Sequence, residues 1–160
     1  MITFNADEIF EMAEQMERNG ANYYTKAATQ ASGKPAEVLA GLAEMEKDHE
    51  KTFHEMRARL GAAEQRTASF DPDNQAAAYL QAATAGKVFK LRDDPSAKLT
   101  GKEDIRQILQ TAIGLEKDSI VFYLGLKDLV APDLGRDKID EIIRQELGHI
   151  ATLTEQLAAC

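Results

Sequence analysis

The stretches Glu46-Lys47-Asp48-His49 and Glu146-Leu147-Gly148-His149 decide the fold of this 160-residue chain. Residues three apart lie on the same face of a helix, so each stretch places a carboxylate beside an imidazole, and the two together can hold a metal ion from one side. Each stretch also lies within a long segment whose apolar residues recur every three or four positions, the period of a helix with one buried face. The carboxylates and imidazoles are therefore expected on the inner faces of helices.

The same periodicity predicts four long helices and leaves no segment that is typical of a strand. Capping-box patterns mark the start of the first helix at Asn5-Ala6-Asp7-Glu8 and of the third long helix at Thr100-Gly101-Lys102-Glu103. Gly61 is expected to end the second helix, and the turn-rich segment 61–100 has room for one short helix. The predicted helices cover residues 6–31, 35–60, 73–86, 101–130 and 136–158.

The order of these helices predicts an all-α fold in a single domain that spans residues 1–160. Tight turns make the helices of each pair antiparallel, whereas the 61–100 connection is long enough to carry the chain back along the bundle. The four long helices then run up, down, down and up. One long crossover connection, here carrying a short helix, distinguishes ferritin-like four-helix bundles from simple up-and-down ones.

Four glutamates interrupt the apolar faces of the long helices, where an unpaired carboxylate is costly. Glu17 precedes Glu46 by 29 positions and Glu116 precedes Glu146 by 30, so the chain looks like two copies of one helical hairpin. A tyrosine follows each lone glutamate by seven positions. The repeated set consists of the candidate metal ligands Glu17, Glu46, His49, Glu116, Glu146 and His149, with Tyr24 and Tyr123 beside them.

The charge and donor chemistry of this set indicate the metals that would suit it. Its four carboxylates carry four negative charges, which two divalent ions cancel. Oxygen and imidazole donors suit iron or manganese, and the lack of a thiolate speaks against structural zinc. The sequence therefore predicts a site for two metal ions inside the bundle.

Composition speaks against several other classes of protein. The net charge of −8, without any run of Lys and Arg, argues against a nucleic-acid surface. The single cysteine, Cys160, cannot form an intrachain disulfide or a Cys-rich metal site. No apolar stretch is long enough to span a membrane, and Met1 to Phe10 lacks the pattern of a secretory signal, so we expect a cytoplasmic protein.

Several other side chains have ordinary structural interpretations. A single glutamate at the edge of an apolar face can reach water, although this does not explain six residues in repeated register. His54 has Lys51 three positions before it, and we expect His54 at the surface. Tyr23, Met45 and Met56 are expected to pack in the core.

Over nearly its whole length the chain resembles the rubrerythrin-like branch of the ferritin-like superfamily of di-iron carboxylate proteins. The resemblance rests on the six candidate ligands and the two tyrosines. It implies a cofactor of two iron ions. Manganese or a mixed pair are alternatives, and zinc is an alternative in the protein as purified. By the same resemblance, Glu46 and Glu146 would bridge both ions. The other four ligands would bind one ion each, namely Glu17, His49, Glu116 and His149.

The resemblance also implies a homodimer, and it gives Tyr24 and Tyr123 a hydrogen bond to a carboxylate across the bundle. Two features depart from the family. Full-length rubrerythrins carry a rubredoxin-like domain with four cysteines, which this chain lacks, so its electrons would come from an external donor. Many rubrerythrins have an extra glutamate one turn beyond Glu116, where this chain has Ser119, and this difference bears on a rubrerythrin-type peroxidase mechanism.

The function that follows is a di-iron oxidoreductase that reduces hydrogen peroxide or dioxygen. One alternative is a ferroxidase or iron-binding protein that handles iron as cargo. Another is a helical module without catalytic activity. The presence of all six ligand positions favours the first two hypotheses over the third.

Overall fold

The computed structural model describes residues 5–62, 75, 78 and 93–160. Within these residues it contains four long helices, two short 3-10 helices and no β-strand, as predicted. The predicted helix at 73–86 lies outside the described residues, apart from positions 75 and 78. The elements are α1 (Ala6–Gln30), α2 (Gly33–Ala58), η1 (Pro95–Lys98), α4 (Ile105–Leu129), η2 (Pro132–Leu134) and α5 (Arg136–Ala159).

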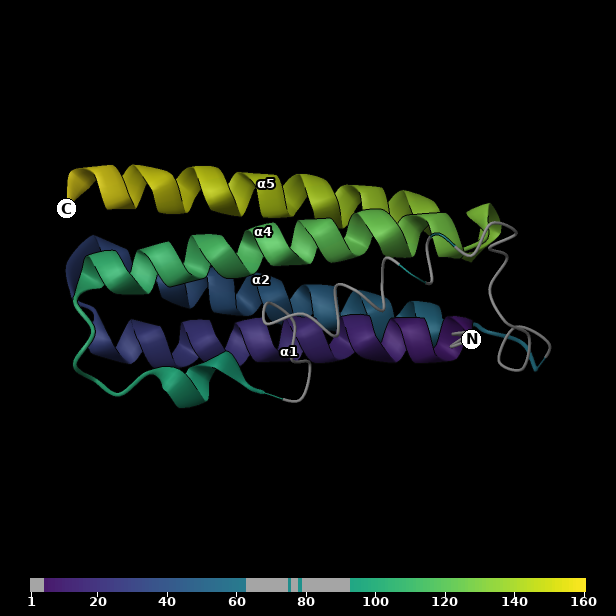
Figure 1. The fold of residues 1–160 in the computed structure, drawn as a ribbon, viewed down its shortest axis with the longest axis horizontal. Coiled ribbons are helices and arrows are strands. Elements are labelled where there is room, and N and C mark those ends of the chain that lie inside the picture. The colour runs from purple at the N-terminus through teal and green to yellow at the C-terminus, as the bar shows by residue number, and fades with distance from the viewer. Residues whose placement is uncertain (1–4, 63–74, 76–77, 79–92) are drawn as a thin grey trace.

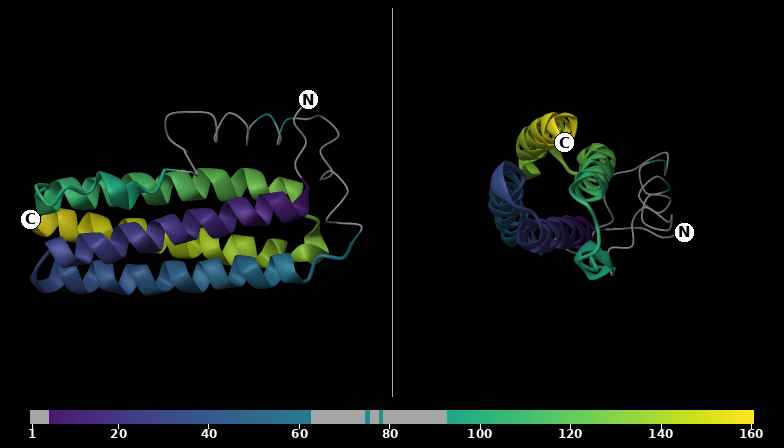
Figure 2. Two further views of the ribbon diagram at one scale, coloured as in Figure 1. Left: turned by 90° about the horizontal axis from the view of Figure 1, so that it is seen from below. Right: turned by 90° about the vertical axis from the view of Figure 1, so that its left-hand side faces the viewer.

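The four long helices form a bundle in which α1 lies beside α2 and α4 lies beside α5 (Figures 1 and 2). Each of these pairs is antiparallel, whereas α2 and α4 run in the same direction (Figure 1). The chain leaves α2 at one end of the bundle and enters α4 at the other end, so the connection between them crosses its full length (Figure 1). The predicted order of up, down, down and up is therefore confirmed.

The short helix η1 attaches the end of this connection to α1. Lys26 Nζ donates to the carbonyl oxygen of Ser96 at 2.9 Å, and Asn22 Nδ2 donates to Asp94 Oδ2 at 2.8 Å. Asp94 also caps η1, because its side chain accepts from the backbone N–H of Ser96. These contacts place the chain at the end of the bundle where α4 begins.

Of the two capping boxes predicted at helix starts, the structure confirms one and contradicts the other. Asn5 forms the predicted capping box at the start of α1. The prediction for Thr100 is wrong, because α4 begins at Ile105 and Asp104 is its capping residue. Glu103 instead accepts the backbone N–H groups of Thr100 and Gly101 in the turn before the helix, so this box pattern closes a loop.

The other boundaries differ from the predicted ones by only a few residues. Helix α2 ends at Ala58 with Arg59 as its C-cap, so Gly61, predicted to follow the helix end directly, lies two residues beyond the cap. The prediction that Met45 packs in the core is wrong, because this residue is 41 % exposed. The buried residues of α2 include Leu42, Glu46 and His49, and Met45 lies outside this face.

The core is divided into two apolar parts that lie on either side of the predicted ligands along each helix. One part contains Phe10, Met16, Phe53, Met56, Phe122 and Ile139, and the other contains Tyr23, Leu39, Leu42, Leu109, Ala112 and Leu153. The core positions predicted for Tyr23 and Met56 are confirmed. Between the two parts, each long helix has at least one buried glutamate.

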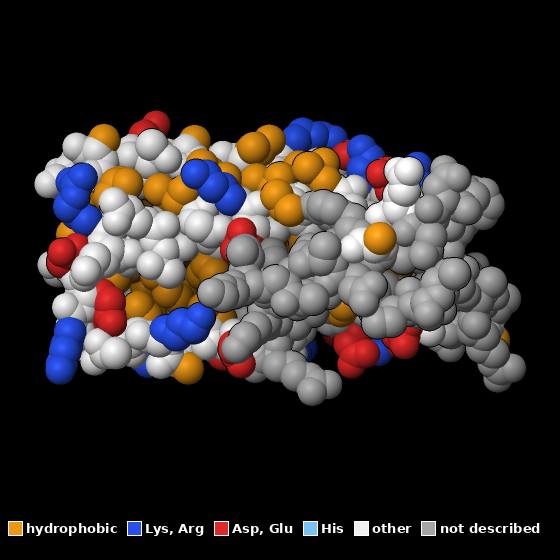
Figure 3. All heavy atoms as spheres, in the orientation of Figure 1, with side chains coloured by type: hydrophobic (Ala, Val, Ile, Leu, Met, Phe, Trp, Pro, Cys, Tyr) orange, Lys and Arg blue, Asp and Glu red, His pale blue; other side chains and the backbone are white. Residues whose placement is uncertain are grey.

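The outer surface has mixed charge. On the face shown in Figure 3, the described basic and acidic side chains are interspersed among uncharged ones. None of the helices in the described part of the chain has a stretch both long and apolar enough to cross a membrane.

Candidate metal centre

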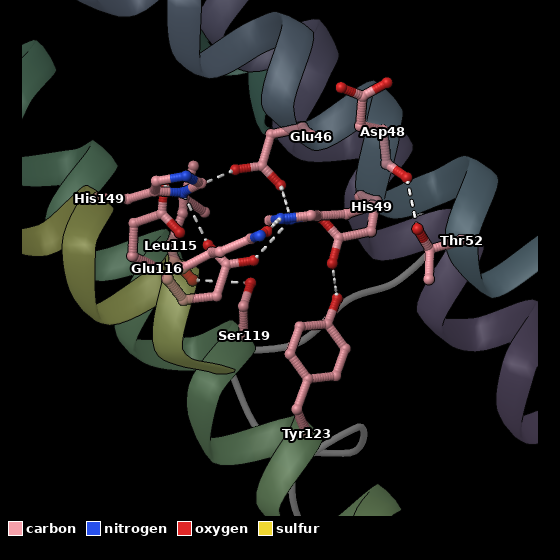
Figure 4. A network of polar contacts seen from close by, with 12 residues as sticks. Glu46, Asp48, His49, Thr52, Leu115, Glu116, Ser119, Tyr123 and His149 are labelled. Atoms are coloured by element: carbon pink, nitrogen blue, oxygen red, sulfur yellow. Dashed lines mark hydrogen bonds and ion pairs between the residues drawn. The ribbon is translucent and has the colours of Figure 1, made fainter. Parts of the chain in front are cut away.

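The predicted ligands meet at mid-length of the bundle, where each long helix contributes at least one of them (Figure 4). Their side chains point inward because each occupies an apolar helix face, as Glu17 does between Ala13 and Tyr24 on α1. All six are buried. Their ligand atoms form two groups within 4.8 Å, one of Glu17, Glu46, His49 and Glu146 and the other of Glu46, Glu116, Glu146 and His149.

Glu146 and Glu46 belong to both groups and lie between the two histidines. Glu146 Oε1 is 3.0 Å from His49 Nδ1, and Glu146 Oε2 is 2.8 Å from His149 Nδ1. Glu46 likewise has one oxygen 3.6 Å from His49 Nδ1 and the other 3.4 Å from His149 Nδ1. Each of these carboxylates therefore presents one oxygen to each half of the site, which is the arrangement of a bridging ligand.

The remaining two glutamates belong to one half each. Glu17 Oε2 lies 3.5 Å from His49 Nδ1, and Glu116 Oε1 lies 3.4 Å from His149 Nδ1. The two imidazole rings are stacked, with centroids 5.7 Å apart. The centre thus has the two-fold repeat that the sequence shows.

The two tyrosines bind the carboxylates that are not shared. The Tyr24 hydroxyl on α1 donates to Glu116 on α4. The Tyr123 hydroxyl on α4 donates to Glu17 on α1, and Figure 4 shows Tyr123 pointing toward the centre. Burial and the neighbouring carboxylates raise the pKa of both phenols well above its ordinary value, so both hydroxyls remain protonated. Each tyrosine therefore links the two helical hairpins through a ligand.

Burial and mutual repulsion give the four carboxyls different pKa values. Burial first, and then the charge of Glu46, raise the pKa of Glu17 and Glu116 well above the ordinary value. Burial also acts to raise the pKa of Glu46, but its hydrogen bonds to Glu17 and to both histidines outweigh this effect and lower it. The pKa of Glu146 is lowered as well, because hydrogen bonds to both histidines outweigh burial and the charge of Glu46.

Both histidines are held in the protonated form. Burial acts to lower the pKa of His149, but hydrogen bonds to Glu116, Glu146 and Glu46 outweigh it and raise the pKa to about 11. The pKa of His49 is raised for the same reason. In the metal-free cluster these shifts therefore favour protons on Glu17, Glu116 and both histidines, and negative charge on Glu46 and Glu146.

Unpaired ligand atoms indicate that the cluster fits metal ions. Among the described residues, several buried atoms lie near an oppositely charged group but form no hydrogen bond of good geometry, namely Glu46 Oε1, both carboxylate oxygens of Glu146, and Nδ1 of both histidines. Such atoms are costly to bury unless something binds them. Coordination to two cations would satisfy all of them, and the oxygen and imidazole donors suit iron or manganese.

Two polar residues near the centre were not predicted from the sequence. Gln145 Oε1 lies 2.6 Å from His49 Nε2, and only the tertiary structure brings these residues together. Glu14 is buried beside Glu17 on α1, and its Oε1 is 3.5 Å from Nδ1 of His54. Its position three residues before Glu17, on the same helix face, was a signal in the sequence.

His54 and Ser119 lie outside the two ligand groups. The side chain of His54 is 70 % exposed, which confirms its predicted surface position. The Ser119 hydroxyl donates to the carbonyl oxygen of Leu115 at 3.2 Å, so it is engaged with its own helix (Figure 4).

A structural comparison agrees with this architecture. A crystal structure from Thermotoga maritima, provisionally assigned as a ferritin-like diiron-carboxylate protein, superposes with a TM-score of 0.72 over 99 % of this chain and 97 % of that chain. The fold is ferritin-like. The two sequences are 22 % identical, so the likeness is one of fold. No protein-family model matches the chain, and a search of curated proteins finds no match.

Proposed function

We propose that the six-residue centre binds two iron ions and that the protein is a rubrerythrin-like oxidoreductase that reduces hydrogen peroxide or dioxygen. The observation that supports this most strongly is that Glu46 and Glu146 belong to both ligand groups. A site for a single ion would need only one such group. Two shared carboxylates between two histidines suit a pair of ions held close together.

The roles of the side chains follow from their positions. Glu46 and Glu146 would bridge the two ions, Glu17 and His49 would complete one position, and Glu116 and His149 would complete the other. Iron pairs supply two one-electron redox steps at neighbouring positions. Tyr24 and Tyr123 hold the unshared carboxylates in place through hydrogen bonds.

The proposed reaction needs electrons that the chain itself does not store. Reduction of hydrogen peroxide consumes two electrons and two protons and yields two water molecules. The only cysteine is Cys160, so the sequence holds no cysteine cluster for a second redox centre. We therefore propose that an external donor returns both electrons after each turnover.

Anaerobic loading with ferrous iron, followed by titration with hydrogen peroxide, tests this function. We expect about two irons per chain, a ferric charge-transfer band, and consumption of about one peroxide per iron pair. Glu146→Gln should abolish the band, whereas Glu155→Gln, at an exposed position of the same helix, should leave it unchanged. Fewer than one iron per chain, or no band, would contradict the proposal.

The same experiment distinguishes the alternatives. A protein that handles iron as cargo would oxidise many irons per chain and would need a cage or a storage partner. A helical module without catalytic activity would show no metal-dependent change. The proposed homodimer is a separate matter, which sedimentation of the iron-loaded protein tests through its mass.

A further inference from the structure

We propose that Gln145 positions His49 and thereby makes the two metal positions unequal in affinity. This inference rests on the proposed two-metal function. It concerns the position formed by Glu17 and His49, which would bind an ion more tightly than the position formed by Glu116 and His149.

The contact between Gln145 and His49 selects one form of the imidazole ring. Gln145 Oε1 is 2.6 Å from His49 Nε2. An amide oxygen only accepts hydrogen bonds, so Nε2 carries the proton and donates it. When the ring is neutral, Nδ1 is then the unprotonated nitrogen, and it is the atom that faces Glu146 at 3.0 Å. Gln145 therefore holds His49 in the form that can bind a metal ion.

Among the described residues, none supports His149 in the same way. Its Nδ1 faces Glu146 at 2.8 Å, just as Nδ1 of His49 does. Its Nε2, however, is buried without a hydrogen-bond partner among the residues that the structure describes. The two rings thus make the same inward contact and differ in their outward one.

The difference can be traced to one break in the sequence repeat. Gln145 directly precedes Glu146, and the residue that directly precedes Glu46 is Met45. A thioether sulfur is only a weak acceptor, and Met45 is 41 % exposed. The three candidate ligand positions of one half recur in the other half, whereas among the described residues the outer hydrogen bond occurs in one half.

Gln145 can be replaced without disturbing the core. It is exposed, and it lines a cavity of about 270 Å³ between α2 and α5 together with Asp48, Thr52 and Ile142. Substitutions at such a position leave the apolar packing intact. A change in metal binding in a Gln145 variant would therefore report on His49 and not on loss of the fold.

The expected size of the effect comes from the general behaviour of metal-binding histidines. A hydrogen bond to the second ring nitrogen fixes the ring orientation and raises the basicity of the ligand nitrogen, and its loss typically lowers metal affinity about 10- to 100-fold. We expect Gln145→Met to weaken the tighter of the two binding steps by about tenfold or more. Gln145→Glu keeps an acceptor oxygen and should retain the tight step.

Anaerobic titration of metal-free protein with Co²⁺, followed by its visible absorption, tests this inference. The wild-type chain should bind two ions in two steps of different affinity. The Gln145→Met chain should also bind two ions, but the affinities of its two steps should differ less. Gln110→Met, the same change at an exposed position of α4, is the matched control. The unfolding midpoints of the metal-free variants are measured in parallel and should agree with the wild type.

Each outcome has a distinct meaning. Two unchanged steps in Gln145→Met, equal weakening of both steps, or the same effect in Gln110→Met would overturn the role of Gln145 while leaving the proposed function intact. Loss of the tight step in Gln145→Glu would also overturn it. A wild-type chain that binds fewer than two ions would contradict the proposed function, and this inference with it.

Discussion

At the scale of single residues, the centre contains two kinds of carboxylate. Glu46 and Glu146 turn one oxygen toward each histidine, whereas Glu17 and Glu116 each accept a hydrogen bond from a tyrosine and face one histidine. Because the shared carboxylates would contact both ions, their loss should have a larger effect than loss of an unshared one. This difference can be measured directly.

We predict that Glu46→Gln lowers the metal content from two ions per chain to less than one, whereas Glu17→Gln lowers it to about one. An amide cannot supply the charge that a bridging position needs, and Glu17 serves only the position of His49. Metal analysis after anaerobic loading and desalting measures both values. Glu14→Gln, a change at a buried position of α1 outside both groups, is the control and should retain two ions. Two ions in the Glu46→Gln protein would show that the carboxylate does not bridge.

We predict that Tyr123→Phe lowers both the free energy of unfolding and the metal affinity. The Tyr123 hydroxyl donates to buried Glu17, and a lost hydrogen bond that leaves a buried acceptor unpaired costs about 1–3 kcal/mol. Urea unfolding of metal-free protein and a metal titration measure the two effects. Tyr23→Phe is the matched control, because Tyr23 donates to the carbonyl oxygen of Ile108 at 2.9 Å and should affect stability alone. Equal losses of metal affinity in the two variants would refute the role given to Tyr123.

At the scale of elements, the turn between α4 and α5 sets the register in which Glu116 meets Glu146. Gly135 precedes α5 with φ of 100°, in the left-handed region that side chains other than glycine rarely adopt. A Cβ atom at this position would also lie 2.9 Å from Met56 Cε. The turn is therefore built around glycine, and the packing of α2 against it depends on that choice.

We predict that Gly135→Ala lowers the free energy of unfolding by about 1–2 kcal/mol, the cost of the left-handed conformation for a residue with a Cβ, with a further cost from the shift of Met56. Gly41→Ala, within α2 and facing open space, should instead raise it by about 0.5–1 kcal/mol because alanine favours the helix. Urea unfolding of the metal-free proteins measures both changes. Destabilisation of similar size in the two variants would mean that the conformation of Gly135 is not the cause.

At the scale of the whole molecule, the charge of the centre alters the charge of the chain. The formal value of −8 counts the four glutamates of the centre as ionised and both of its histidines as neutral. The raised pKa values of Glu17, Glu116 and the two histidines favour four further protons, and with all four bound the net charge would be about −4. Replacement of these four protons by two divalent ions leaves that charge unchanged.

We predict that the metal-free protein becomes less stable as the pH rises from 6 to 8. The histidines and the unshared glutamates have raised pKa values when folded, so their stabilising effect is complete below the unfolded pKa and is lost as the pH rises through the folded pKa. Each extra proton held by the folded state costs about 1.4 kcal/mol per pH unit. Chemical unfolding with a chelator present, at pH 6, 7 and 8, measures the slope, and equal stability at all three values would contradict the prediction.

The lowered pKa values of Glu46 and Glu146 have the opposite effect on how stability depends on pH. Their stabilising effect is present above the ordinary carboxyl pKa and is lost as the pH falls through the folded pKa. The metal-free protein should therefore be most stable in mildly acid solution. Protein loaded with metal should not lose stability between pH 6 and 8, because the ions have displaced the protons.

We predict that binding of two divalent ions at pH 7 releases about four protons per chain, because metal ligands bind in their deprotonated form. Two protons would come from Glu17 and Glu116, and two from the histidines. Titration of metal-free protein in weakly buffered solution with a pH indicator measures the release. The Glu17→Gln protein should release fewer protons per chain, and binding of two ions without proton release would contradict the pattern of pKa values.

How much of the fold and of the centre could be predicted from the sequence depends on how far apart along the chain the residues concerned lie. Helical periodicity links positions three, four and seven apart, so it was sufficient to place Glu46 and His49 on one inner face and to assign four long helices. It was less reliable at the edge of a face, where Met45 proved to be exposed. It also failed at the start of α4, because the pattern at Thr100 suits both a loop and a helix cap.

By itself, the sequence determined the helices, their order and the repeated set of ligands, because these depend on spacing along the chain and on the cost of burying charge. Only the tertiary structure decided which oxygen of Glu146 faces which histidine, that Tyr123 binds Glu17, and that Gln145 supports His49. These contacts join different helices, and their geometry depends on how the helices pack. Local periodicity carries no information about such distances, which is why the asymmetry of the centre emerges only in three dimensions.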